Sequence, residues 1–394
     1  MKKEYILPAG FASAGIHAGI KKSGKPDAGL IYSSTPCRAV GFFTKNSLKS
    51  VHIRHAMKAV NGPIQAVFAN SGSANVLTGK TGVTDLEAIL KKAAEILLIK
   101  PSAMLGAATG KISKPLPLKN ILANMEKLAG AISARDKSFP GAIMTTDTVE
   151  KYASDVITIG GKKVVICAAG KGAGMISPDM ATMLVFCMTD AAIDRKLLRR
   201  AALEAVQSSF NRVTVDGDMS PNDTVYVLAN GEAGNKEIKT QGTDYIKLKN
   251  ALKGIFYSIA EDMVMDGEGA TKFIKISISG AKTQAQAELV ARRVANSQLV
   301  KTAFFGMSLN PGRIISAAGQ TFADFNPEKA VLKFNGRTAL SGGRLDEKNR
   351  VAAEKELKKR RIELELNLAN GKYGCYLLTS DLSYDYVKIN ADYN

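Results

Sequence analysis

Apolar residues recur at helical spacing in five stretches of the chain and form short continuous or alternating runs elsewhere. Between 84 and 98, for example, Leu86, Ile89 and Leu90 share one face of a helix. The same spacing predicts helices over 84–98, 116–132, 194–210, 244–263 and 283–304. Apolar runs predict strands over 163–168, 182–188, 224–228 and the alternating 273–279. We therefore expect a mixed α and β fold.

The predicted strands gather in groups between helices instead of alternating with them one for one. Strict alternation is typical of a doubly wound parallel sheet, whereas grouped strands favour layered sheets with helices on the outside. No internal repeat, low-complexity tract or glycine-rich linker divides the sequence. The pattern therefore favours a layered α/β fold and marks no domain boundary.

The composition is that of a folded protein with a strong positive charge. With 394 residues, 45% of them hydrophobic, the chain can bury one large core or two ordinary ones. Its 54 basic and 36 acidic residues give a net charge of +18, which raises the alternative of a basic nucleic-acid-binding protein. The densest charge cluster, 353–367, mixes both signs and lacks aromatic residues that could stack on bases. A solvated surface is therefore favoured, and nucleic-acid binding stays a remote alternative.

Cysteine usage and hydropathy predict a cytoplasmic protein without a membrane span. Cys37, Cys167, Cys187 and Cys375 are scattered and form no C-x-x-C pair, so neither a disulfide framework nor a zinc ribbon is indicated. The longest apolar run, 181–189, is well short of the roughly 20 residues that a spanning helix needs. We therefore expect reduced thiols and no membrane partner.

Two further patterns are weak signals for nucleotide or metal binding. Residues 19–25 (GIKKSGK) match the spacing of a phosphate-binding loop, but Pro26 stands where the magnesium-binding hydroxyl is needed, so a solvated turn is favoured. His17, His52 and His55 have no third ligand or carboxylate at metal spacing, so no metal site is expected. Any nucleophile in this histidine-poor chain is expected to use another base.

The most informative stretch is 168–190, where a glycine-rich turn around Lys171 leads into an apolar strand that begins at Thr182. One interpretation is a tight strand connection with a buried threonine, since glycines allow positive φ and close approach. In the other interpretation, Thr182 is the nucleophile of an enzyme. A threonine freed at its own amino end carries an α-amine with a pKa of about 7.7 to 8.0, which supplies the base beside its hydroxyl.

Two shorter segments are weaker candidates for catalysis. In 107–111 (AATGK), the Thr109 hydroxyl and the Gly110 amide could form an oxyanion hole, although Thr-Gly pairs are also ordinary turn residues. In 263–272 (MVMDGEGATK), Asp266 and Glu268 follow a predicted helix and suit either a helix cap or a functional role.

The segment KGAGMISPDMATML, 171–184, closely resembles the self-cleaving segment of the ornithine acetyltransferase family of arginine biosynthesis. Further segments of the chain resemble the same family, namely 19–33, 70–79, 109–110, 143–148, 209–224, 264–273 and 381–393. The resemblance therefore extends over essentially the whole chain.

The resemblance implies a fold and a processing step. Family members have an αββα layered sandwich similar to that of the DmpA aminopeptidases, and the precursor cuts itself between the residues matching Ala181 and Thr182. An α chain, 1–181, and a β chain, 182–394, would then fold together and assemble as two of each.

The resemblance also implies residue roles and an activity. Thr182 would be the nucleophile, and Thr109 and Gly110 would form the oxyanion hole. The substrate contacts implied are Thr145, Lys171, Thr182, Glu268 and Asn390. The acetyl group would pass from N-acetylornithine to Thr182 and then to glutamate, with no metal or cofactor. Acetyl-coenzyme A as a second donor is left open, and a threonine amidase or aminopeptidase is the alternative.

Three segments depart from the family pattern. The threonine usually found five residues beyond the Asn390 position is absent, because the chain stops at Asn394. The common D-P-N-W-G-R stretch is SLNPGR, 308–313, and 70–79 is NSGSANVLTG where N-S-G-N-A-N-A-C-T-G is commoner. These changes leave Thr182 and the oxyanion pair intact, so they bear on substrate affinity or donor choice.

Overall fold

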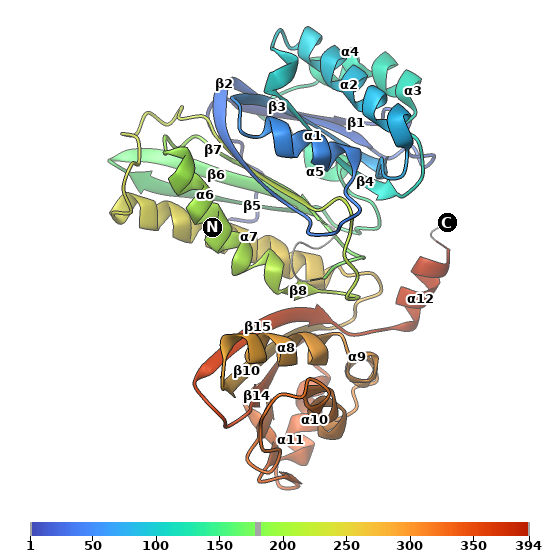
Figure 1. Ribbon diagram of the computed structural model, residues 1–394, viewed down its shortest axis with the longest axis vertical. Helices are drawn as coiled ribbons and strands as arrows, with labels where there is room; N and C mark the ends of the chain where they lie inside the picture. The colour runs from blue at the N-terminus through green and yellow to red at the C-terminus, as the bar shows by residue number, and fades with distance from the viewer. Residues whose placement is uncertain (1, 178–182, 393–394) are drawn as a thin grey trace. The chain divides into compact units, whose positions relative to one another are not determined.

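The computed structural model describes residues 2–177 and 183–392, which divide into two compact units (Figure 1). The larger unit comprises Met1–Gly172, Asp179–Asn211 and Asp218–Ala260, and the smaller one Ala173–Pro178, Arg212–Gly217 and Glu261–Asn394. Thr182 and Ala181, the predicted nucleophile and cleavage partner, lie outside the described residues.

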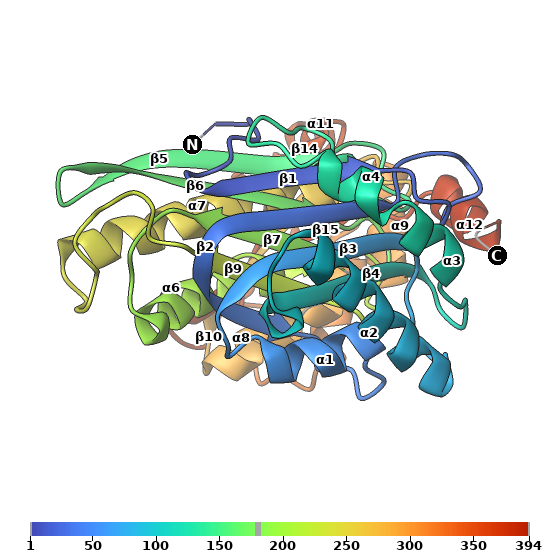
Figure 2. The same ribbon diagram turned by 90° about the horizontal axis from the view of Figure 1, so that it is seen from above.

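Eight strands of the larger unit form one continuous ladder in the order β4-β3-β2-β9-β7-β6-β5, with β1 also paired to β2. They are β1 (Phe11–Ile16), β2 (Ala28–Phe43), β3 (Ile64–Ser73), β4 (Met104–Lys111), β5 (Lys151–Ile159), β6 (Lys162–Lys171), β7 (Leu184–Thr189) and β9 (Thr224–Ala229). The long strand β2 joins two layers, because its first half pairs with β1 and β3 and its second half pairs with β9. Figure 2 shows β1 to β4 lying over the layer that contains β6, β7 and β9.

A hydrophobic core fills the space between these two layers. Phe186 of β7 and Tyr226 of β9 pack in it with Val67 of β3 and Leu105 of β4, all fully buried or nearly so. Alternate residues of β7, such as Val185, are also buried, on the opposite face of their layer. Both faces of the layer are therefore covered.

Helices cover the outer faces of the larger unit. They are α1 (Val51–Ala59), α2 (Gly79–Ile96), α3 (Leu118–Ala123), α4 (Met125–Gly130), α5 (Phe139–Ala142), α6 (Arg195–Gln207) and α7 (Thr243–Met265), of which α7 ends in the smaller unit. Helices α2, α3 and α4 pack on the β1 to β4 layer in a second core. Helices α6 and α7 lie beside one another, joined by Glu204 with Lys249 and Lys253, on the far side of the other layer (Figure 1). The predicted αββα layering is confirmed.

The smaller unit has its own sheet, ordered β13-β12-β11-β14-β10-β15-β8. Its strands are β8 (Val213–Thr214), β10 (Phe273–Ala281), β11 (Val331–Phe334), β12 (Arg337–Ser341), β13 (Arg344–Leu345), β14 (Arg361–Asn367) and β15 (Tyr373–Ser380). Its helices are α8 (Gln284–Ala295), α9 (Gln298–Phe305), α10 (Pro311–Gly319), α11 (Arg350–Leu357) and α12 (Tyr384–Ala391). The buried face of the sheet and the helices α8 to α11 share one core.

The structure corrects two of the five predicted helices. The stretch 283–304 is two helices, because Ser297 caps the start of α9 by accepting a hydrogen bond from the Val300 amide at 3.4 Å. The stretch 116–132 is also two short helices, α3 and α4, which meet at Asn124. The other predicted helices and the four predicted strands are present, with ends shifted by a few residues.

The charge cluster at 353–367 lies in α11 and β14 and forms ion pairs within the smaller unit. Lys359 pairs with Glu356 at 2.5 Å, and Glu363 pairs with Lys275 at 2.8 Å. Neighbouring carboxylates therefore partly neutralise the basic groups of this cluster. Such pairing is typical of a solvated surface and not of a nucleic-acid-binding segment.

Candidate active site

Thr109 and Gly110 end strand β4, where it runs parallel to β3. In this ladder Thr109 is opposite Ser71 and Gly110 is opposite Gly72. Gly110 has a φ of +125°, and a Cβ built on it would lie 2.5 Å from the backbone of Gly72. Only glycine fits this close approach of two backbones. The segments 70–79 and 107–111, both singled out in the sequence, therefore meet at one point.

Lys171 brings its ammonium group to Thr109 from the end of strand β6. The side chain is 2% exposed, and its Nζ donates to the Thr109 Oγ1 at 3.2 Å. Because a lysine ammonium is only a donor, it makes the Thr109 oxygen an acceptor. The hydroxyl hydrogen of Thr109 is then available to a second oxygen, which is what an oxyanion-hole donor requires.

Asp147 is the buried anion of this cluster and is not among the candidate residues that the sequence predicts. Its Oδ1 accepts from Lys151 Nζ at 2.7 Å and from the Gly172 amide at 2.8 Å, while its Oδ2 accepts from the Thr145 amide at 3.0 Å. Lys171 Nζ is 4.0 Å from Oδ2. Burial alone would raise the pKa of Asp147, but Lys171 and Lys151 hold it well below its ordinary value. Asp147 thus fixes both the Thr145 backbone and the turn after Lys171.

Asp147 belongs to the segment 143–148 (IMTTDT), which resembles the family. This carboxyl group lies two residues after Thr145 and four before Lys151, with which it pairs in the structure. The sequence does not predict that Lys171 lies close to Asp147, because this proximity depends on the pairing of β5 with β6.

The segment 19–25 is a turn built around Asp27 and holds no phosphate-loop geometry. The amides of Ala18, Ile20 and Lys21 donate to the Asp27 carboxylate at 2.6 to 2.8 Å. The side chain of Lys21 donates to the Met144 carbonyl at 2.7 Å, next to Thr145. Burial, despite nearby Asp27, lowers the pKa of Lys21 to about 8. Lys21 is therefore a second residue that holds the 143–148 segment, a contact that the sequence does not predict.

Asp223 lies beside Met183, the residue that follows the predicted nucleophile Thr182 in the sequence. It is completely buried, and its Oδ1 accepts from the Met183 amide at 3.2 Å. Burial raises the pKa of this carboxyl group well above its ordinary value. Leu184, the next residue, pairs with Lys171 across β6 and β7. The strand that begins after position 182 is thus anchored next to Lys171.

Glu268 and Asn390 lie together in the smaller unit. The Asn390 Nδ2 donates to Glu268 Oε2 at 2.8 Å, and the Glu268 amide donates to the Ala173 carbonyl at 2.9 Å. The Glu268 carboxylate lies over Gly174, where a Cβ would be 2.4 Å from it. Ser383 Oγ ties α12 to the same turn by donating to the Gly269 carbonyl at 2.6 Å. Two predicted substrate contacts are therefore adjacent, although they are 122 residues apart.

His17 belongs to the turn around Asp27, with its Nδ1 2.9 Å from Asp27 Oδ2, whereas His52, Cys37 and Cys167 lie in the core away from these clusters. Burial lowers the pKa of His52 to about 3 and raises that of Cys37 and Cys167 to about 12, so these groups are neutral side chains of the core. Within 2–177 and 183–392, no three His, Cys, Asp or Glu side chains gather as a metal site would require. Of the helices in that part of the chain, none is long and apolar enough to cross a membrane.

Comparisons with known proteins match large parts of the chain, and the family model and the relatives match nearly all of it. The model of the ArgJ family matches residues 12–394. The chain is 42% identical to the arginine biosynthesis bifunctional protein ArgJ of Symbiobacterium thermophilum over 98% of its length and 97% of the relative's. It is 41% identical to the Geobacter sulfurreducens protein of that name, over 98% of each chain. A crystal structure of ArgJ from Bacillus halodurans superposes with a TM-score of 0.50 and 36% identity, covering 52% of this chain and 97% of that one.

Proposed function

Since the chain belongs to the ArgJ family, we propose that it transfers the acetyl group of N-acetylornithine to glutamate through an acetyl ester on Thr182. The family places the protein in arginine biosynthesis. The observation that carries the chemistry is the hydrogen bond from Lys171 to Thr109, which leaves the Thr109 hydroxyl hydrogen available to a developing oxyanion.

In the first half of the proposed cycle, Thr182 Oγ attacks the acetyl carbonyl while its own α-amine takes the hydroxyl proton. The Thr109 hydroxyl and the Gly110 amide stabilise the negative oxygen of the tetrahedral intermediate. The carbon–nitrogen bond then breaks, the proton passes to the departing amine, and ornithine leaves. In the second half, the glutamate amine attacks the ester carbonyl and gives a proton to the Thr182 α-amine, the bond to Thr182 Oγ breaks, and Oγ takes that proton as N-acetylglutamate leaves.

The strand order supports a processed enzyme whose two chains stay together. Strand β6 precedes position 182 and β7 and β9 follow it, yet the three are neighbours in one sheet. A cut between Ala181 and Thr182 would leave the α chain, 1–181, hydrogen-bonded to the β chain, 182–394. Assembly as two of each chain is carried over from the family resemblance alone.

The proposed substrate contacts differ in their chemistry. Lys171 offers a positive charge for a carboxylate, whereas Glu268 can face an ammonium group or relay a proton. Asn390 and Thr145 offer polar groups that orient the substrate backbone. The proposed cycle uses no metal or cofactor, and acetyl-coenzyme A would enter only as a second acetyl donor.

The experiment is an assay of ornithine release from N-acetylornithine by the purified full-length protein, with and without glutamate. Acetyl transfer predicts sustained release only when glutamate is present, together with formation of N-acetylglutamate. Sustained release that does not depend on glutamate would instead support the threonine amidase alternative. A Thr182→Ala variant should neither cut itself nor release ornithine, whereas Thr182→Ser keeps a hydroxyl and should retain part of both activities.

A further inference from the structure

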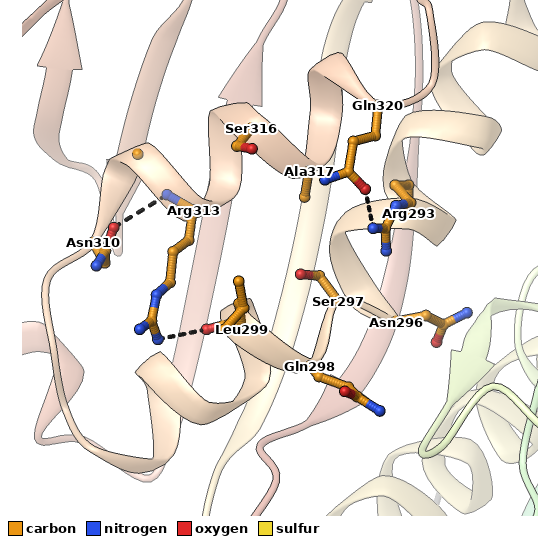
Figure 3. A pocket seen from close by; sticks show the side chains of 11 residues that line it. Arg293, Asn296, Ser297, Gln298, Leu299, Asn310, Arg313, Ser316, Ala317 and Gln320 are labelled. Carbon is orange, nitrogen blue, oxygen red and sulfur yellow. Dashed lines mark hydrogen bonds between the residues drawn. The ribbon is translucent and has the colours of Figure 1, made fainter.

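The smaller unit has a polar cavity of about 600 Å³, and none of the residues that line it is assigned to the proposed reaction (Figure 3). It lies where α8 ends and α9 and α10 begin. The residues lining it are Arg293, Asn296, Ser297, Gln298, Leu299, Asn310, Gly312, Arg313, Ser316, Ala317 and Gln320. Its size is in the range of small-molecule sites. The segment 308–313, which departs from the family pattern, supplies part of its wall.

Two guanidinium groups face this cavity from different helices. Arg293 comes from α8 and Arg313 from α10, and Figure 3 shows them on opposite sides with Ser297 and Ser316 between. Arg293 donates to the Gln320 side chain, and Arg313 donates to the Leu299 carbonyl at 2.9 Å. In the part of the chain that the structure describes, neither arginine pairs with a carboxylate, and no acidic residue lines the cavity. Its positive charge is thus not neutralised locally.

The hydrogen-bond acceptors of the wall are largely in use. Asn310 Oδ1 accepts from the Arg313 amide at 3.1 Å, and Ser297 Oγ accepts from the Val300 amide at 3.4 Å. Asn296 Oδ1 accepts from Thr214 Oγ1 at 2.7 Å. Each guanidinium group has five N–H donors. One donor of Arg293 is used by the Gln320 side chain and one donor of Arg313 by the Leu299 carbonyl, so further donors remain for a ligand. A matching ligand must therefore bring acceptors and negative charge.

We propose that this cavity binds a phosphate-bearing small molecule between Arg293 and Arg313. A phosphate group offers three acceptor oxygens, and the planar guanidinium matches two of them at once. A single carboxylate would use fewer of the available donors. The proposal does not rest on the proposed acetyl transfer, because it involves none of the residues assigned to that reaction.

The test is calorimetric titration of the full-length protein with pyrophosphate, adenosine 3′,5′-bisphosphate and succinate at two salt concentrations. The first two probes separate free phosphate from a nucleotide as the source of the same chemistry, and succinate represents a dicarboxylate. We expect saturable binding of at least one phosphate compound. Arg293→Gln and Arg313→Gln should each weaken it by roughly tenfold or more, and Arg313→Lys should weaken it less than Arg313→Gln.

The matched control is Arg344→Gln, which removes one charge from an exposed arginine of the smaller unit outside the cavity. It should leave the affinity unchanged, and the thermal unfolding midpoint of each variant shows whether it is folded. Absence of binding, equal losses in all three glutamine variants, or tighter binding of succinate than of either phosphate compound would overturn the proposal. Equal losses would mean nonspecific attraction to a chain of net charge +18.

Discussion

The two groups of proposed site residues differ in how firmly the fold holds them. In the larger unit, Lys171, Lys151 and Asp147 are 2%, 1% and 8% exposed, and Asp147 receives three hydrogen bonds from neighbouring groups. In the smaller unit, Asn390 is exposed on the last helix, and its side chain donates to the half-buried Glu268 and to the Tyr386 carbonyl of the same helix.

This difference matches the work that each group is proposed to do. Stabilisation of an oxyanion depends on donors that are fixed before the reaction, since reorienting them would cost free energy at the transition state. Contacts to the ends of a substrate tolerate more movement and contribute mainly to binding. We therefore expect substitutions near Asp147 to affect kcat most, and substitutions near Asn390 to affect KM.

The largest effect is expected for Lys171→Met. The change removes the donor to Thr109 and one positive neighbour of the buried Asp147, so kcat/KM should fall by more than about a hundredfold. Lys162→Met, at the exposed start of the same strand, is the matched control and should leave kcat/KM nearly unchanged. Steady-state kinetics with N-acetylornithine and glutamate measures both. Similar activity in the two variants would remove Lys171 from the site.

Thr109→Val should come next, with a loss in kcat of about a hundredfold, because one oxyanion donor is removed while the shape of the side chain is kept. Thr109→Ser restores the hydroxyl and should recover most of the rate. If valine and serine variants have the same kcat, Thr109 acts through packing and not as a donor.

A smaller effect is expected for Asn390→Ala, with KM raised about tenfold and kcat nearly retained, because one hydrogen bond beside Glu268 is lost. Asn390→Asp should raise KM further, because it places a second negative charge next to Glu268. An equal fall in kcat and kcat/KM for the alanine variant would contradict a role confined to substrate binding.

The smallest effect is expected from pH. The pKa of Asp147 is depressed in the folded protein, so the stability it contributes is fully present above its unfolded pKa of about 3.9 and is lost as the pH falls toward the folded pKa. The difference in free energy of unfolding between the protein and its Asp147→Asn variant should stay constant from about pH 5 to 8. This difference in free energy of unfolding should become smaller below about pH 4. If it instead disappears near neutral pH, the proposed ion pairs of Asp147 do not stabilise the fold. Denaturant titrations across this range measure it.

Much of the fold could be predicted from the sequence where the signal was local, and the same sequence signals named the candidate site residues. The strand over 163–168 and the helix over 244–263 follow from spacing alone, and the resemblance at 171–184 led to Lys171 and Thr182. Glu268 and Asn390, which the resemblance implied as substrate contacts, are adjacent in the structure, and their roles stay a prediction.

The rest depended on contacts between distant segments. Strand β2 joins two layers, which no hydrophobic pattern within its own residues predicts. Asp147 and Lys21 became visible as parts of the site only once β5, β6 and the 19–25 turn were in place. The break between α8 and α9 could not be predicted from hydrophobic spacing, because the apolar spacing continues across Ser297. The serine itself is a favourable helix N-cap.

The central claim is that acetyl passes through Thr182, and the mass of the β chain tests it most directly. The full-length protein is incubated with N-acetylornithine without glutamate, quenched in acid, and measured intact and after digestion. We predict a β chain that begins at Thr182 and is heavier by one acetyl group on that residue, and glutamate should remove the added mass. An uncut chain, or an unmodified Thr182 in a sample that still forms N-acetylglutamate, would contradict the account.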